Sequence, residues 1–228
     1  MSNTTNIAAA QTDNWDWGAV SDFMPHFWDG LLVTLQILAL GSLISFTLGL
    51  VWALAFRAPT RFVRWPVGII TEFIRNTPLL VQLFFLFFVL PEWGVQFSAL
   101  TTGIIAIGLH YSTYTAQVYR AGIEAVPVGQ WEAATALSLP YRHTWTAVIL
   151  PQAFRRVVPA LGNYVVAMLK DTPLLSAISV LELLQRAKLQ AGETFQYTEP
   201  LTVVGVAFIL IAYPASLLLR ALERRLVR

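Results

Sequence analysis

The sequence predicts an all-α membrane protein with five transmembrane helices, and three observations lead to this prediction. The chain of 228 residues is 56% hydrophobic and 12% charged, with a mean hydropathy of +0.61. A soluble domain carries about 25% charged residues, so half that density indicates that lipid is the solvent. Long uncharged stretches recur along the chain, and basic residues gather in alternate connections between them.

A membrane-spanning helix needs roughly 20 predominantly apolar residues. We expect spans at about 30–56, 66–90, 95–119, 157–180 and 200–220. The first, third and fifth are clear from their apolar length alone. The second carries Glu72 and Arg75, which are three residues apart and can pair on one helix face, and Pro78, which is expected to bend the helix.

The distribution of basic residues predicts the orientation. The first 29 residues contain four Asp and no Lys or Arg, and we expect residues 1–28 to form an external N-terminal tail. All but three of the 15 basic residues flank the connections after the first and third spans or follow the fifth; the exceptions are Lys170, Arg186 and Lys188. Because Lys and Arg concentrate on the cytoplasmic side, the N-terminus is predicted outside and the C-terminus inside.

Residues typical of catalytic and metal sites are scarce. The absence of cysteine excludes disulfides, thiolate catalysis and Cys-ligated metals. His26, His110 and His143 show no metal-ligand spacing, and neither Lys170 nor Lys188 follows the glycine of a nucleotide-binding loop. We expect no metal, no cofactor and no nucleic-acid partner, and we expect ATP chemistry to belong to another subunit.

The connection at about 121–156 is unusual for its small residues. Pro127 and Gly129 interrupt the chain after the third span, and a short helix is expected from Glu132 until Pro140 ends it. Its small residues are Ala133, Ala134 and Ala136. They permit close approach to another surface, while Glu132 offers a charge to a basic partner. From spacing alone, an ordinary amphipathic connector is an equally good interpretation.

The specific residues of this connection favour the interpretation as a docking surface. Glu132-Ala133-Ala134 followed by Leu150-Pro151, with Val148 in an Ile position, resembles the "EAA" loop by which permeases of bacterial ABC importers bind their ATPase. Ser138 departs from this pattern, because the family usually has Gly there. Serine is still small, so the resemblance is only slightly weakened.

Further motifs resemble the permeases of the polar amino acid uptake family, and the resemblance covers about residues 30–225. The matching runs are Glu72–Gln82, Arg120–Ile123, Leu150–Arg155 and Leu169–Thr172. A second departure is Gln117, at a position where the family often has Glu. It removes a charge from the membrane and bears on substrate preference or gating rather than on the family assignment.

The resemblance implies that residues 29–225 form a type I ABC-importer transmembrane domain in a bacterial cytoplasmic (inner) membrane. Such a subunit forms half of a translocation path for a polar amino acid or amino-acid-like zwitterion. Its implied partners are a cytoplasmic ABC ATPase dimer, a second permease that is identical or homologous, and an external or periplasmic binding protein. The implied ATPase-coupling residues are Gln130, Glu132, Ala133, Ala134, Ala136, Leu137 and Ser138.

Polar residues inside spans are costly and therefore mark candidate path residues. His110, Tyr114 and Gln117 share one face of the third span by the i, i+4, i+7 rule, and Asn163 lies one to two turns before Lys170 on the fourth. We hypothesise that these faces line the path; for a lone His or Tyr in a span, interhelical hydrogen bonding is the commoner alternative.

Lys170 and Asp171 point about 100° apart on a helix, so each needs another partner or the helix must unwind, as Pro173 favours. A broken helix suits a zwitterionic substrate. Structural anchoring of the span to a neighbouring helix or subunit is the equal alternative.

Two other functional classes compete with the importer subunit. A self-contained secondary transporter or channel could use Lys170-Asp171 for ion coupling, but the chain shows no inverted repeat. A membrane enzyme is disfavoured, because the sequence offers no carboxylate pair, no histidine cluster and no nucleophile with a plausible base.

Overall fold

The computed structural model of the protein describes residues 15–226 and is predominantly helical in this range, without a β-strand. Its elements are α1 (Trp17–Phe56), α2 (Arg61–Asn76), α3 (Leu79–Phe84), η1 (Phe85–Val89), η2 (Leu90–Trp93), α4 (Ala99–Glu124), α5 (Val128–Ala136), α6 (Tyr141–His143), η3 (Thr144–Ile149), α7 (Leu150–Asp171), η4 (Thr172–Ile178), α8 (Leu183–Thr194) and α9 (Thr198–Leu226). Helices α1 and α9 are long and apolar enough to cross a membrane by themselves, and two bent helix pairs qualify when each is taken as one span. Helix α4 has 26 residues, which is long enough to cross, but it carries many polar side chains.

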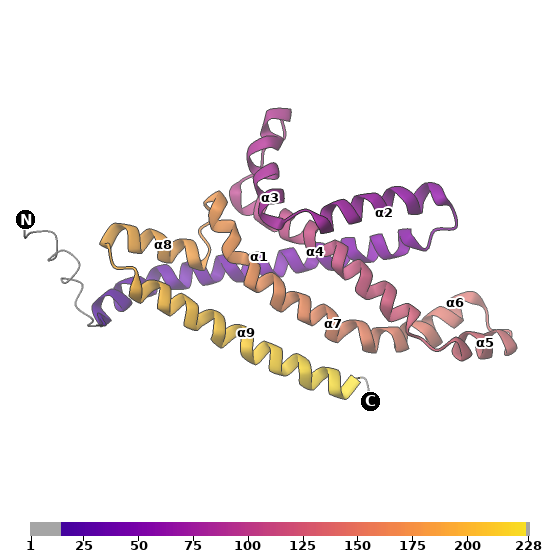
Figure 1. The fold of residues 1–228 in the computed structure, drawn as a ribbon. Helices are drawn as coiled ribbons and strands as arrows, with labels where there is room; N and C mark the ends of the chain where they lie inside the picture. The colour runs from indigo at the N-terminus through magenta and orange to yellow at the C-terminus, as the bar shows by residue number, and fades with distance from the viewer. Residues whose placement is uncertain (1–14, 227–228) are drawn as a thin grey trace, which may run out of the picture.

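Helix α1 is the central helix of the bundle and packs against α2, α4, α7, α8 and α9 (Figure 1). Its 40 residues give a length of about 60 Å, roughly twice the hydrocarbon thickness. It begins at Trp17, because the Asp16 side chain caps it by accepting from Gly18 N at 2.7 Å. Residues 17–28, expected as part of a tail, are therefore helical, while the part of that tail before residue 15 lies outside the described residues.

The connection between α2 and α3 is a sharp elbow of 103° at Thr77 and Pro78. At the bend the backbone carbonyls of Ile74 and Thr77 lack their usual donors four residues on, because Pro78 has no N–H and the Val81 N–H donates to the Pro78 carbonyl. The Gln82 amide Nε2 reaches back to both, at 2.6 Å and 2.9 Å. The expected bend at Pro78 is thus present, and Gln82 satisfies the carbonyls that it exposes. Helix α3 packs against α4 and η4, and the chain beyond it, η1 and η2, extends away from the bundle (Figure 1).

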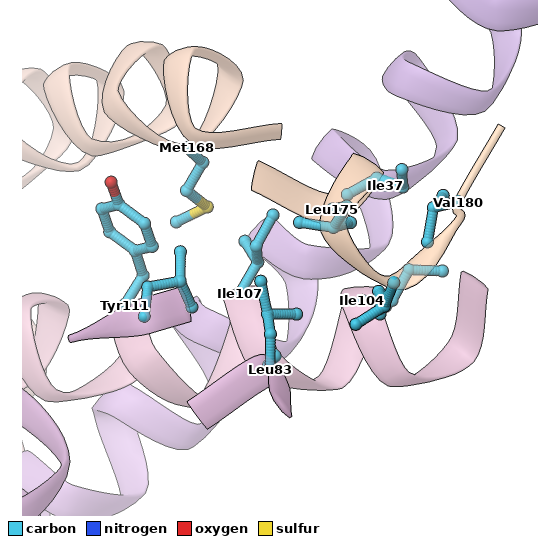
Figure 2. Packing of buried hydrophobic residues seen from close by; sticks show 11 residues of the cluster. Ile37, Leu83, Ile104, Ile107, Tyr111, Met168, Leu175 and Val180 are labelled. Atoms are coloured by element: carbon cyan, nitrogen blue, oxygen red, sulfur yellow. The ribbon is translucent and has the colours of Figure 1, made fainter. Parts of the chain in front are cut away.

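The main apolar cluster lies where α1, α3, α4, α7 and η4 meet. Figure 2 shows the cluster and labels these members: Ile37, Leu83, Ile104, Ile107, Tyr111, Met168, Leu175 and Val180. In lipid, such a cluster is held by van der Waals contact and close backbone approach rather than by exclusion of water. Accordingly, a Cβ added to Gly108 of α4 would fall 2.6 Å from Ile44 of α1. The cluster fixes how α4 and α7 are rotated toward each other.

Helix α8 packs between α1 and α9 at the end of the molecule that also holds the start of α1 (Figure 1). The buried Glu182 carboxylate caps it by accepting from the backbone of Leu184 and Gln185, and Leu183 N donates to Thr34 Oγ1 of α1 at 3.1 Å. The α5–α6 region lies at the opposite end of the molecule. Any signal from that region to α8 must therefore pass along the long helices.

Candidate coupling loop and substrate path

Helix α5 presents one inward and one outward face. Ala134 is buried, and Trp131 packs into the apolar cluster beneath the helix. The remaining predicted coupling residues are exposed: Gln130, Glu132, Ala133, Ala136, Leu137 and Ser138. Val128 and Leu137 are exposed over 70% and 72% of their surfaces. The outward face therefore combines one carboxylate, small side chains and apolar ends. Ala134 faces inward, and its small side chain lets α5 lie close to the apolar cluster beneath it.

The end of α5 explains the departure at Ser138. Ser138 has φ of 51°, in the left-handed region, where L-residues other than glycine are disfavoured. Its N–H donates to the Thr135 carbonyl at 2.9 Å, and the Leu139 N–H donates to the Ala134 carbonyl at 3.0 Å. This pair of bonds is the Schellman helix ending, whose left-handed position glycine usually occupies. Ser138 therefore adopts the left-handed conformation that glycine favours, although its Cβ makes this conformation less favourable.

The loop is braced against α4 and α7 rather than hanging free. Beneath it, Ile123, Val126, Ile149 and Ala153 form a buried cluster. Arg156 of α7 donates to the Ala125 carbonyl at the end of α4. Further out, Gln152 Nε2 of α7 donates to Gln130 Oε1 of α5 at 3.2 Å. The loop therefore forms one packed unit with the inner ends of both helices.

A second group of polar side chains lies between α4 and α7. Tyr111 Oη donates to Asp171 Oδ2 at 2.7 Å. The rings of His110, Tyr114 and Tyr164 adjoin Tyr111 or one another, with centroids 5.3 to 6.1 Å apart. A half-buried carboxylate that is hydrogen-bonded to one tyrosine of a four-ring cluster is an arrangement that can receive an ammonium group, by charge and by cation–π attraction.

The predicted path residues of α4 have separate partners. His110 is buried, and its Nδ1 lies 3.0 Å from Gln82 Nε2 at the elbow. Tyr114 Oη donates to the Arg75 carbonyl at 3.4 Å. Gln117 Oε1 accepts from Arg120 at 3.4 Å. The third-span face expected from the sequence therefore contacts α2 and α3 as well as α7.

Helix α7 divides the predicted residues between two faces. Tyr164 and Asp171, seven residues apart, share the face toward α4. Asn163 and Lys170, also seven apart, are exposed on a face about 100° away. The structure thus brings Asp171 together with His110 and Tyr114, and leaves Asn163 and Lys170 outside that group.

Two members of the group, Tyr111 and Tyr164, were absent from the predicted set. Tyr111 lies one position from His110 and hence off the face considered. The usable signal was the charge of Asp171, which requires a donor from a neighbouring helix. The helix also changes form there, since α7 ends at Asp171 and continues as the 3₁₀-helix η4. Asp171 therefore has a partner on a neighbouring helix, and the α-helix continues as a 3₁₀-helix instead of unwinding.

A cavity of about 260 Å³ lies in the elbow rather than at Asp171. Its lining is apolar except for Thr77 and Gln82, and includes Phe73, Val81 and Phe85. Such a lining suits an apolar group rather than a zwitterion, because burying unpaired charges is costly. The cavity is therefore a poor candidate for a polar substrate site.

Comparison with known proteins decides the family. Residues 45–228 match the family described as "binding-protein-dependent transport system inner membrane component". The chain belongs to this family. It is therefore a membrane permease subunit of an ABC importer, a class of transporter in which the ATPase is a separate subunit.

Individual permeases match over nearly the whole chain. The probable amino-acid ABC transporter permease protein y4tG of Sinorhizobium fredii is 46% identical over 93% of this chain and 92% of its own length. The L-cystine transport system permease protein TcyB of Bacillus subtilis is 36% identical over 100% of this chain and 97% of its own.

Among solved structures, a chain of the "crystal structure of an amino acid ABC transporter with histidines" is 33% identical in sequence to this chain. The two superpose with a TM-score of 0.88 over 93% of this chain and 99% of that one. The expected all-α permease fold and the family resemblance are thus confirmed.

Proposed function

We propose that this permease imports a polar amino acid or an amino-acid-like zwitterion, driven by a cytoplasmic ATPase dimer that docks on the Glu132 face of α5. The observation that carries the proposal is the outward face of α5, where the Glu132 carboxylate stands among small exposed residues on a loop braced to α4 and α7. A partner that moves α5 would therefore move two spans. The relatives named for amino acids and for cystine support the substrate class.

The arrangement of the chain supports an outside N-terminus and an inside C-terminus. The α1–α2 connection, the α5–α6 loop and the end of α9 lie at the same end of the molecule (Figure 1). The arginines of these three regions are the ones that the positive-inside rule assigns to the cytoplasm. That end is where an ATPase would reach Glu132, while the end with α8 would face a binding protein.

We propose that the path runs along the α4–α7 region. Asp171, which is linked through Tyr111 to the rings of His110 and Tyr114, would receive the amine of the substrate, and Lys170 its carboxylate. Gln117 and Asn163 would add hydrogen bonds. Since Asn163 and Lys170 lie on the exposed face of α7, we place them toward a second permease subunit, identical or homologous, that completes the path.

Affinity purification in detergent, with the ATPase co-expressed, tests the coupling proposal. We expect the ATPase to co-purify with the natural chain and to be lost with Glu132→Lys. The matched control is Glu193→Lys, which reverses an exposed charge on α8 at the opposite end and should keep the ATPase. Retention by Glu132→Lys would contradict docking on this face. A chain that transports in liposomes without ATPase or ATP would instead identify a self-contained transporter.

A further inference from the structure

The end of the first span, α1, is far from the α5–α6 loop in sequence, yet the two regions are in contact in the fold. Trp131 of α5 and Trp145 of η3 lie edge to face, with centroids 5.3 Å apart and planes 78° apart. Tyr141 of α6 adds a third ring, 6.0 Å from Trp145. The guanidinium carbon of Arg57, the residue that caps α1, lies 5.1 Å from the centroid of the Trp145 ring. These contacts connect α5 to the end of α1 in two steps.

A second contact holds the same end of α1. The guanidinium carbon of Arg120, near the end of α4, lies 4.5 Å from the centroid of the Phe56 ring. Two adjacent residues at the end of α1 therefore each make a cation–π contact. The ring of Phe56 receives the Arg120 cation, and the Arg57 cation lies over the Trp145 ring. Guanidinium groups bind aromatic faces in this way because the ring face is electronegative.

The position of Trp145 depends on these contacts. Its indole Nε1 is buried and has no hydrogen-bond partner within residues 15–226, so no hydrogen bond of that atom orients the ring there. Ring and cation contacts, together with packing on the apolar cluster beneath the loop, set its position. A displacement of Trp131 would consequently displace Trp145 and be felt at Arg57.

The reach of α1 makes this link consequential. Helices α4 and α7 flank the loop in sequence and receive its movement through the backbone. Helix α1 packs against α2, α4, α7, α8 and α9, and so touches elements that the loop does not touch. Its N-terminal half contacts α8, where Leu183 N donates to Thr34 Oγ1. Movement delivered to α1 would reach the opposite side of the bundle.

We propose that Arg57 is a coupling residue, which conveys movement of the ATPase-facing helix α5 into α1 through Trp145 and Trp131. This inference rests on the proposed docking of an ATPase on α5. Arg57 binds neither ATP nor substrate in this scheme. Its removal should therefore spare assembly and ATP hydrolysis while weakening the transport obtained from each ATP.

The test uses the complete transporter, with permease, ATPase and binding protein, reconstituted in liposomes with an amino acid that it transports. Uptake and ATP hydrolysis are measured together, and the readout is substrate imported per ATP hydrolysed. Arg57→Gln removes the cation and keeps a polar side chain of similar length. Arg61→Gln, at the exposed start of α2 nearby, is the matched control. We expect Arg57→Gln to lower the ratio by about two- to tenfold, with Arg61→Gln unchanged.

Two further variants keep the proposal falsifiable if Arg57→Gln fails to assemble. Trp145→Leu removes the ring face but keeps an apolar side chain, and Arg57→Lys keeps the cation without the planar fork. Both should lower the ratio, and Arg57→Gln combined with Trp145→Leu should be no worse than the poorer single variant. Natural ratios in Arg57→Lys and Trp145→Leu, or effects that multiply in the combination, would overturn the inference. Failure of the natural chain to retain the ATPase would instead count against the docking proposal.

Discussion

The Tyr111 hydroxyl lies 2.7 Å from Asp171 Oδ2 and joins α4 to α7 at the residue where α7 gives way to a 3₁₀-helix. A carboxylate at this depth needs a donor, and a change of helix type needs support from a neighbour. One hydrogen bond serves both purposes. It also fixes which face of α7 turns toward α4, and hence which polar residues face the rings of His110 and Tyr114.

Removing that hydroxyl should loosen the α4–α7 contact. Tyr111→Phe keeps the ring and deletes the donor, so we expect a loss of stability of about 0.6–2 kcal/mol, the range for interhelical hydrogen bonds in membranes. Thermal unfolding in detergent measures it. Tyr213→Phe, on an exposed position of α9, makes the same chemical change and should be neutral. Equal unfolding temperatures for the two variants would contradict a structural role for the bond.

Alanine substitution of Asn163 and Gln117 tests the proposed path. Each loses one hydrogen-bonding side chain, and Asn163 is exposed, so membrane levels should stay natural. Loss of a hydrogen bond to a charged substrate should raise the KM of uptake by about fivefold or more. Gln36→Ala, which removes an exposed amide from α1, is the control. Natural uptake kinetics in both path variants would remove these residues from the path.

The left-handed position at Ser138 predicts an unusual gain. Ser138→Gly relieves the backbone strain, so we expect the loop to become more stable by about 0.5–1 kcal/mol, with ATPase binding retained. Ser138→Val, with its branched side chain, should destabilise it by at least as much. Hydrogen exchange of the amides of residues 134–139 reports the local change. Slower exchange in the valine variant than in the glycine variant would refute the assignment.

Close packing of α1 on α4 predicts opposite outcomes for two glycines. A Cβ at Gly49 would overlap the Thr115 hydroxyl and lie 3.0 Å from the Ser112 carbonyl, which cannot move without shifting α4. Gly49→Ala should therefore destabilise the protein by about 1–3 kcal/mol. Gly205 of α9 has open space around it, so Gly205→Ala should be neutral or stabilising through helix propensity. Thermal unfolding of both variants, side by side, gives the answer.

Several features of the fold and site could be predicted because they depend on short stretches of sequence. Apolar length predicts spans, Pro78 predicts a break, and Glu72 and Arg75 predict an ion pair, which is present at 3.0 Å. The proposed coupling loop can be located because the residues of its motif are contiguous. Ser138 could be recognised as a departure, but its meaning required the backbone conformation, with φ of 51°.

Other features depend on how the helices are rotated and cannot be obtained from periodicity. The grouping of Asp171 with Tyr111, the division of α7 into two polar faces, and the contact of Arg57 with Trp145 join residues that are 60 or more positions apart or differ only by about 100° on one helix. A pattern of i and i+4 identifies a face but does not say which neighbour that face meets.

The sequence by itself determined that this is an all-α membrane permease and where its proposed coupling loop lies, because hydropathy, charge distribution and a contiguous motif are local properties. Only the tertiary structure decided which polar groups meet, how sharply α2 turns into α3, and how α5 is linked to α1. Those outcomes depend on the close approach of helices at small residues such as Gly49, where one atom too many would rotate or separate them.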